Sequence, residues 1–262
     1  MRKFLRLFFY ALIFMVPFFL FYLLPIGKNP DKKPLEERYK KIRRKMKGID
    51  KSLKVDVITE GFDKLDKNQN YFFVCNHLSV IDPVSFMDVY ERPVTFVAKK
   101  EVVKIPAVKT FVNCLGGLMM DREDLKQSLR VMMKVEADLK EGKRSWLIYA
   151  EGTRNVDPNA NIREMHHGTF RPAVKSQTPI VPVISYGSFR GLNLKLHFKK
   201  HPIHYKVLEP ITYEQYKDMS TEEISRLVQS LIQKELSFNI RRLDHEYNLK
   251  VNKKQYILNR IS

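Results

Sequence analysis

Short apolar segments that alternate with amphipathic ones constrain the fold of this chain more than any other feature of its 262 residues. Seven segments have the length of strands and are rich in β-branched and aromatic residues: 54–59, 71–75, 94–98, 118–121, 145–149, 180–184 and 204–207. Five others have helical spacing or helix-terminal signals: 84–90, 107–115, 124–141, 169–176 and 221–239. This alternation predicts an α/β fold, with a mixed, largely parallel sheet flanked by helices.

The predicted helix over residues 124–141 has apolar residues at amphipathic spacing and is followed by Gly142, a residue suited to the position after a helix. We expect its apolar side chains to pack in the core and not to bind a ligand. They are Leu125, Leu129, Met132, Met133, Val135 and Leu139.

A segment of eighteen residues without a charge, 7–24, lies near the N-terminus and follows Arg2, Lys3 and Arg6. This length is at the lower limit for a helix that crosses a bilayer. A secretory signal peptide is the alternative, although no small-residue cleavage site follows the segment. We expect a retained membrane-anchoring helix, and Pro17 near its centre leaves room for a kinked helix that dips into one leaflet without crossing.

Positive charge is concentrated in residues 28–54, where twelve Lys and Arg residues outnumber four acidic ones, and the whole chain has a formal net charge of +18. Such charge implies an anionic partner. Beside an apolar anchor it predicts binding to anionic membrane lipids, with up to about 1 kcal/mol from each basic residue near the surface. A solvated helix face is the alternative. The excess of basic residues after the anchor also predicts that the following domain lies on the cytoplasmic side.

These features divide the chain into four expected parts. Residues 1–27 form the membrane anchor, 28–52 a basic juxtamembrane segment, 53–239 one globular α/β domain, and 240–262 a basic C-terminal extension. The two cysteines, Cys75 and Cys114, provide no disulfide framework, and we expect both to be reduced core residues.

The strand expected at residues 71–75 ends in a polar loop that contains His77 and leads to Asp82 and Pro83. Pro83 is suited to the first position of a helix, which makes Asp82 a plausible N-cap. On a regular helix an offset of five residues would turn the two side chains roughly 140° apart, whereas in a loop that enters a helix they can meet. A carboxylate that accepts from one imidazole nitrogen leaves the other nitrogen as a base. The alternative is a surface histidine beside an ordinary helix cap.

Four motifs in this part of the chain resemble, in order, those of the glycerolipid acyltransferases, the family of 1-acylglycerol-3-phosphate acyltransferases. The similarity covers residues 53–210. The motifs are Asn76-His77 with Asp82; Lys99-Lys100-Glu101-Val102, Ile105-Pro106 and Gly117-Leu118-Met119-Met120-Asp121-Arg122; Glu151-Gly152-Thr153-Arg154; and Ile180-Val181-Pro182-Val183.

The resemblance implies acyl transfer from a thioester to an alcohol, with residues 53–239 as the catalytic domain. His77 would be the general base and Asp82 the residue that orients it. No covalent intermediate is required. The resemblance implies no bound cofactor, and acyl-CoA or acyl carrier protein would be the co-substrate. A basic surface suits both donors, because coenzyme A carries phosphates and acyl carrier protein is acidic.

The resemblance also assigns the acceptor phosphate to residues of the second and third motifs. They are Lys99, with Lys100 as an alternative, Arg122, Glu151, Gly152, Thr153 and Arg154. A guanidinium such as that of Arg154 can hold a phosphate through two parallel hydrogen bonds, and Gly152 allows close approach of the backbone. A mutual surface salt bridge between Arg154 and Glu151 is the alternative.

Some features depart from the family pattern, and others exclude different chemistry. Tyr149-Ala150 stands where the family usually has Phe-Pro, and Lys109 stands where it often has glycine. These departures put the acyl-chain length and the exact acceptor in doubt. No Gly-x-Ser-x-Gly elbow is present, and Cys75 has the apolar neighbours of a packed side chain. The histidines at 166, 167, 201 and 204 have no acidic or cysteine partner at ligand spacing, so we expect no metal site.

We therefore consider three hypotheses for the function. The first is transfer of a fatty acyl group to lysophosphatidate, which gives phosphatidate in phospholipid synthesis at a membrane. The second keeps this reaction but uses another lysophospholipid or a glycolipid as acceptor. The third is a basic binding protein tethered to the membrane, which charge alone supports. We expect no nucleic-acid partner, since the sequence has no helix-turn-helix, zinc-finger or aromatic RNA-binding signature.

Overall fold

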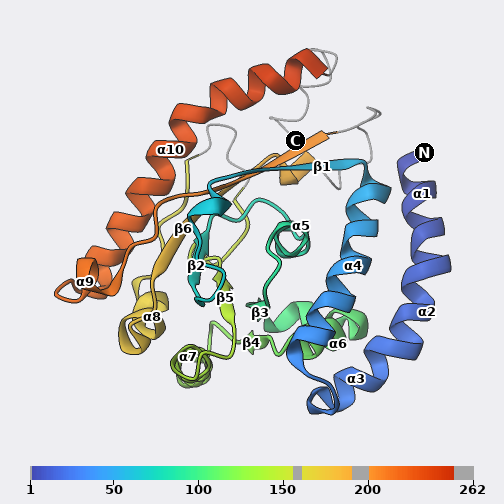
Figure 1. Cartoon of the computed structure of the whole chain (residues 1–262), viewed down its shortest axis with the longest axis horizontal. Coiled ribbons are helices and arrows are strands. Elements are labelled where there is room, and N and C mark those ends of the chain that lie inside the picture. The colour runs from blue at the N-terminus through green and yellow to red at the C-terminus, as the bar shows by residue number, and fades with distance from the viewer. Residues whose placement is uncertain (1, 156–160, 191–200, 251–262) are drawn as a thin grey trace.

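A seven-stranded sheet runs through the centre of the chain (Figure 1). The computed structural model describes residues 2–155, 161–190 and 201–250. The strands lie in the order β1-β7-β6-β2-β5-β3-β4, and every neighbouring pair is parallel except β6 and β7. Their bounds are β1 Val55–Glu60, β2 Phe72–Cys75, β3 Val94–Lys99, β4 Leu118–Met120, β5 Ser145–Ile148, β6 Ile180–Tyr186 and β7 His201–Val207.

Helices cover both faces of this sheet. The α-helices are α1 Arg2–Tyr10, α2 Val16–Phe18, α3 Leu24–Lys28, α4 Leu35–Leu53, α5 Asp82–Val89, α6 Pro106–Cys114, α7 Leu125–Lys140, α8 Arg171–Ser176, α9 Tyr213–Tyr216 and α10 Thr221–Lys250. Short 3-10 turns lie at Pro30–Lys32, Phe62–Lys64, Lys100–Lys104, His167–Phe170 and Ser188–Arg190. The mixed, largely parallel α/β architecture predicted from the sequence is confirmed.

The alternation of side chains along β2 shows how the two faces are built. Phe73 and Cys75 point into a core shared with α4, α5 and α6, whereas Phe72 and Val74 point into a second core under α7, α8 and α10. All of these β2 side chains are fully buried. β2 is therefore a central strand, as its continuous apolar run predicted.

All seven predicted strands are present, with ends that differ by a few residues. Besides α9 and the short 3-10 turns, two longer helical features were not among the predicted helices. Helix α4 lies in the segment read as a basic run, and α10 continues without a break past residue 239 to Lys250. Of the basic extension 240–262, residues 251–262 lie outside the described residues.

The prediction that all the apolar residues of α7 pack in the core is wrong. Val135 and Leu139 are buried, but Leu125, Leu129 and Met133 are exposed by 82%, 43% and 53%. The reason is geometric. Apolar residues cover more of the circumference of α7 than the sheet can bury, and residues four apart form a separate outward stripe.

The N-terminal segment is a single helical run that lies along α4 at one side of the molecule (Figure 1). π-helical turns at Ala11–Met15 and Phe19–Leu23 join α1, α2 and α3. A wider turn before Pro17 accommodates a proline, because proline cannot donate the hydrogen bond that an α-helix would need there. The stretch Leu5–Lys28 has a mean hydropathy of 2.4. By length and composition alone, this helix is long and apolar enough to cross a membrane.

One side of this helical run is packed and the other is open. Phe18, Tyr22, Leu23 and Ile26 join the core, and the Tyr10 hydroxyl donates to the carbonyl oxygen of Lys45 at 2.7 Å. The exposed large apolar residues of the run are Leu5, Phe8, Phe9, Leu12, Ile13, Phe14, Val16, Leu20 and Phe21.

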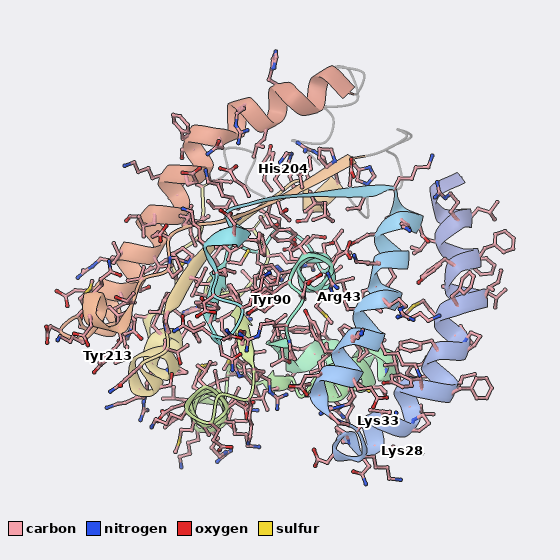
Figure 2. All side chains as sticks on the ribbon, viewed as in Figure 1. Lys28, Lys33, Arg43, Tyr90, His204 and Tyr213 are labelled. Atoms are coloured by element: carbon pink, nitrogen blue, oxygen red, sulfur yellow. The ribbon has the colours of Figure 1, made fainter. Side chains whose placement is uncertain are left out.

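Two arginines of the basic run form hydrogen bonds within the protein. Fewer of its basic residues than predicted are therefore free to bind lipid. The Arg38 side chain is buried, and its Nη1 donates to the carbonyl oxygen of Cys114. Arg43 points from α4 toward α5 (Figure 2), where Nε and Nη2 donate to the carbonyl oxygens of Met87 and Asp88 at 2.9 and 2.8 Å. A cation on the last carbonyls of a helix satisfies acceptors that have no partner within the helix. Arg43 therefore fixes α5 to α4.

A buried carboxyl lies at the same helix interface. Asp50 of α4 is 2% exposed, its Oδ1 accepts from the Ser85 hydroxyl of α5 at 3.1 Å, and its Oδ2 has no partner among the described residues. Burial raises the pKa of Asp50 to about 7; the nearby Asp88 carboxylate acts in the same direction, and the bond from Ser85 opposes both. The folded protein therefore holds a proton on Asp50 at pH values where the unfolded chain has lost it.

This shift predicts that the stability supplied by protonated Asp50 is present below pH 4 and is lost as the pH rises through about 7. In Asp50→Asn the new side chain has nearly the shape of aspartate but cannot ionise. This substitution should raise the free energy of unfolding by at most about 4 kcal/mol at pH 8 and by clearly less, at most about 2 kcal/mol, at pH 5. Thermal unfolding of both proteins in detergent, followed by circular dichroism at the two pH values, measures this. Asp63→Asn, at an exposed aspartate, is the control. Equal effects of Asp50→Asn at both pH values would contradict the assignment.

Candidate active site

His77 and Asp82 meet just beyond the carboxyl end of β2. Nδ1 of His77 lies 2.8 Å from Oδ2 of Asp82, whose side chain is fully buried, whereas 17% of the His77 side chain is exposed. An ionised carboxylate can only accept, so the contact assigns a proton to Nδ1 and leaves Nε2 with its lone pair. The histidine is thus paired and oriented as the loop spacing predicted.

The loop between the two residues holds the Asp82 carboxylate in place. Its Oδ2 also accepts hydrogen bonds from the backbone N–H groups of Leu78 and Ser79, at 2.8 Å each. The Tyr205 hydroxyl donates to the carbonyl oxygen of Asp82 at 2.9 Å. The prediction that Asp82 is an N-cap is wrong in detail: α5 begins at Asp82 itself, and the carboxylate accepts from the preceding loop instead of from the helix.

Tyr149 and Asn155 also restrain His77, one through its ring and the other through its backbone. The Tyr149 ring stacks on it, with centroids 4.1 Å apart and planes 25° apart. The backbone N–H of Asn155 donates to the carbonyl oxygen of His77 at 2.6 Å. Burial raises the pKa of Tyr149 well above its ordinary value, and the nearby Asp82 acts in the same direction, so the phenol stays neutral. The imidazole therefore has little freedom to turn away from Asp82.

Asn76, the first residue of the motif, has an architectural role. Its buried side chain donates from Nδ2 to the carbonyl oxygen of Ser185 at 2.9 Å, and its Oδ1 accepts from the backbone N–H of Ser185 at 2.8 Å. This pair extends the pairing of β2 with β6 beyond the last strand residue. These two hydrogen bonds consequently anchor the first residue of the loop that carries His77 to β6.

Glu151 joins three loops and does not fit the expected phosphate contact. The residue is 3% exposed. Its Oε1 accepts from the backbone N–H of His77 at 2.9 Å, and its Oε2 accepts from Asn155 Nδ2 at 3.1 Å and from the backbone N–H of Arg163 at 2.8 Å. Both oxygens of this buried carboxylate already accept hydrogen bonds from the protein, and its negative charge would repel a phosphate. The alternative of a surface salt bridge with Arg154 is also wrong, because Glu151 is buried and Arg154 is exposed.

The predicted cationic residues stand at the ends of neighbouring strands. Lys99 ends β3 and Arg122 follows β4, whereas Thr153 and Arg154 follow β5 and are exposed. β2, β5, β3 and β4 are consecutive and parallel in the sheet, so these side chains and His77 belong to one edge.

Both candidate lysines, Lys99 and Lys100, have acidic partners. Lys99 Nζ lies 3.3 Å from an oxygen of Glu101. Lys100, the alternative to Lys99, forms an ion pair with Asp121. Partial burial lowers the pKa of Arg122 and Glu101 opposes this, while the guanidinium remains charged at neutral pH. Among the described residues, Arg122 and Arg154 form no ion pair, which leaves their charge available to a ligand.

Gly152 lies where the second and third motifs come together. Its φ of +74° favours glycine, and a Cβ built on it would lie 2.9 Å from Nε2 of His166 and 3.5 Å from Nη1 of Arg122. The sequence predicted that Gly152 allows close approach of the backbone to a phosphate. In this structure a histidine side chain takes that place.

Cys75 and the other histidines offer no competing chemistry. Cys75 is fully buried, and burial raises the pKa of its thiol well above the ordinary value, so it stays protonated. Cys114 is also a free, buried thiol. In the part of the chain that the structure describes, no group of three or more His, Cys, Asp and Glu side chains could hold a metal ion.

Sequence reasoning did not assign a role in the site to Tyr149, Asn155 or His166. Tyr149 was visible as a departure from the family pattern, and His166 as half of a histidine pair. Asn155 carries no signal in the sequence: its bond to Glu151 is local, and its bond to His77 forms only once β2 and β5 pair.

Comparison with known proteins finds similarity in the part of the chain that carries these residues. A family model described as acyltransferase matches residues 56–186, which include His77, Asp82, Glu151 and Arg154. A crystal structure described as the 1-acyl-sn-glycerophosphate (LPA) acyltransferase PlsC from Thermotoga maritima superposes with a TM-score of 0.69, at 24% identity over 90% of this chain and 95% of that one. The two proteins share a fold.

Three curated relatives are called 1-acyl-sn-glycerol-3-phosphate acyltransferase. The protein from Borreliella burgdorferi is 27% identical over 70% of this chain and 72% of its own length. The protein from Saccharomyces cerevisiae is 26% identical over 62% of this chain and 54% of its own length, and the human beta protein is 30% identical over 56% and 53%. The chain thus spans just over half the length of the yeast and human relatives.

Proposed function

The chain belongs to the acyltransferase family, and from this premise we propose that it transfers a fatty acyl group from a thioester donor to the free hydroxyl of lysophosphatidate. The product would be phosphatidate, a precursor in phospholipid synthesis. The observation that carries the proposal is the contact of 2.8 Å between His77 Nδ1 and Asp82 Oδ2, at the strand edge that also carries Arg122 and Arg154. The names of the three curated relatives favour this acceptor.

In the proposed reaction, His77 Nε2 takes the proton of the acceptor hydroxyl while that oxygen attacks the thioester carbonyl. The tetrahedral intermediate then expels the thiolate, which takes the proton back from the imidazolium. An ester and a free thiol result. Asp82 stabilises the imidazolium and keeps its proton on Nδ1. No covalent acyl-enzyme is needed, and acyl-CoA and acyl carrier protein are both suitable donors.

The cations at the ends of β4 and β5 would position the acceptor. The hydroxyl of lysophosphatidate is separated from the phosphate by a few bonds, so a group that fixes the phosphate also fixes the hydroxyl against His77. Lys99 would add to the same positive field. Thr153 would add a hydroxyl next to Arg154, and Glu151 would support the loop without touching the phosphate.

Arg154→Ala tests this assignment of the acceptor. Loss of one charge-assisted hydrogen bond is worth about 1.5–3 kcal/mol, so kcat/KM for lysophosphatidate should fall roughly 10–150-fold. Phosphatidate formation is measured with the purified protein and with each thioester donor in turn. Arg154→Lys should restore only part of the activity, because a point charge lacks the second parallel bond. Arg226→Ala, at an exposed arginine of α10, is the matched control.

A monoacylglycerol lacks the phosphate. Activity on it therefore shows whether Arg154→Ala weakens binding of the phosphate or disturbs the fold. Wild-type protein should use it poorly, and Arg154→Ala should make it little worse. If Arg154→Ala reduced both acceptors by the same factor, Arg154 would support the fold or the donor. If wild-type protein preferred an acceptor without phosphate, lysophosphatidate would not be the substrate.

We further infer that the N-terminal helical run lies in one leaflet and does not cross the membrane. It runs antiparallel to α4 along its length. Arg6 Nη2 donates to the Lys51 carbonyl oxygen at 3.1 Å, the Tyr10 hydroxyl donates to that of Lys45, and Lys41 Nζ lies 3.9 Å from the Tyr22 ring centre. A crossing helix would therefore bring α4 into the hydrocarbon. Several basic residues of α4 are exposed: Lys40, Lys41, Arg44, Lys47 and Lys51. Such charges are costly in a bilayer but suit anionic headgroups of the cytoplasmic leaflet.

The exposed apolar side of the run should thus set membrane affinity. Ile13 and Phe21 are 56% and 82% exposed, and Phe238 of α10 is equally open at 81%. Glutamate at Ile13 or Phe21 removes an apolar group worth about 1.5–3 kcal/mol, so binding to anionic vesicles should fall at least tenfold. The same change at Phe238 should have no effect. Sedimentation of the protein with vesicles measures this, and equal losses for all three variants would contradict the inference.

A further inference from the structure

We propose that His166 and Arg122 together form an anion site, and that this site takes the phosphate monoester of the acceptor. The inference rests on the function proposed above, and it adds a residue that neither the motifs nor the strand ends pointed to. His166 comes from the loop between β5 and α8, whereas Arg122 comes from the loop after β4.

Gly152 defines where the two side chains meet. Nε2 and Cδ2 of His166 lie 2.9 and 3.0 Å from the position that a Cβ would take on Gly152, and Nη1 of Arg122 lies 3.5 Å from the same position. Both nitrogens therefore lie beside the backbone of the third motif, two residues before Arg154. The left-handed φ of +74° favours glycine at this position, and a Cβ there would displace the His166 side chain.

Hydrogen bonds on both sides of His166 fix the loop that carries it. Its backbone N–H donates to the carbonyl oxygen of Ala150 at 3.0 Å. The preceding residue, Met165, is buried; its N–H donates to Gln229 Oε1 at 3.0 Å, and its carbonyl oxygen accepts from the Ser225 hydroxyl at 3.1 Å. These bonds hold the backbone at His166 to Ala150 on one side and to α10 on the other, so little ordering of the loop is needed when a ligand binds.

The charges at this place favour an anion and disfavour a metal ion. Within the described ranges neither His166 nor Arg122 has an ion pair, and the nearby Glu151 carboxylate is occupied by N–H donors. The positive charge of the Arg122 guanidinium near the imidazole repels a cation. An imidazole can donate a hydrogen bond from a ring N–H to a phosphate oxygen.

The neighbouring histidine has a different environment and serves as a control. Nδ1 of His167 lies 2.8 Å from Oε1 of Glu222 on α10, and 58% of its side chain is exposed. His167 therefore faces α10 and already has an acidic partner. A variant at His167 changes the same residue type in the same loop without touching Gly152.

The test compares His166→Leu, His166→Lys and His167→Leu in the full-length protein, on lysophosphatidate and on a monoacylglycerol. His166→Leu removes one hydrogen bond to a charged group, so kcat/KM for lysophosphatidate should fall about tenfold, mainly through KM. Its effect on the monoacylglycerol should be small. His166→Lys should recover activity on lysophosphatidate because it restores a donor, and His167→Leu should match wild type on both acceptors.

Two results would overturn the proposal: unchanged kcat/KM of His166→Leu on lysophosphatidate, or equal losses on both acceptors. If wild-type protein does not acylate lysophosphatidate, the proposed function fails, and binding of inorganic phosphate followed by ³¹P NMR tests the site by itself. Weaker binding by His166→Leu, but not by His167→Leu, would then support the anion site. Equal binding by wild type and both variants would overturn it.

Discussion

The buried carboxylate of Glu151 is the interaction on which the site depends. It accepts from the N–H of His77, from the side chain of Asn155 and from the N–H of Arg163, and so connects the loops after β2 and β5 with the segment that leads to His166. Parallel pairing of β2 with β5 brings the loops to the same edge, but strand pairing alone does not fix loops. Because a buried carboxylate without donors would be costly, folding of these loops is coupled through Glu151. The glutamate of the third motif thus works by holding its neighbours.

A second chain of contacts connects the proposed membrane-facing part with the histidine. The N-terminal run packs along α4, Arg43 of α4 caps the last carbonyls of α5, and α5 begins at Asp82. The Asp82 carboxylate then holds the loop of His77. Part of the basic run therefore has a structural purpose that composition does not reveal. Arg38 and Arg43 face the protein, while other basic residues of α4 remain exposed.

Much of the fold could be predicted from the sequence, because strands buried on both faces are continuous apolar runs and helices begin and end at recognisable residues. The His77–Asp82 pair was also predictable, since its members lie five positions apart across a loop that enters a helix. Contacts between distant segments were not predictable. The place of His166 over Gly152, the stacking of Tyr149 on His77 and the donors of Glu151 exist only after β2, β4 and β5 align. The outward stripe of α7 was misjudged because spacing shows that a face is apolar, not that another element covers it.

The central claim is that His77, oriented by Asp82, is the base for acyl transfer. Turnover by the His77→Ala protein tests it most directly, with circular dichroism and phosphate binding as checks that the fold and the anion site persist. General-base assistance is worth about 10²–10⁴-fold, so a loss of that size in kcat is predicted, and Asp82→Asn should lower kcat with little change in the KM for the acceptor. A folded His77→Ala protein that retained more than about a tenth of wild-type turnover, well outside that range, would contradict the account.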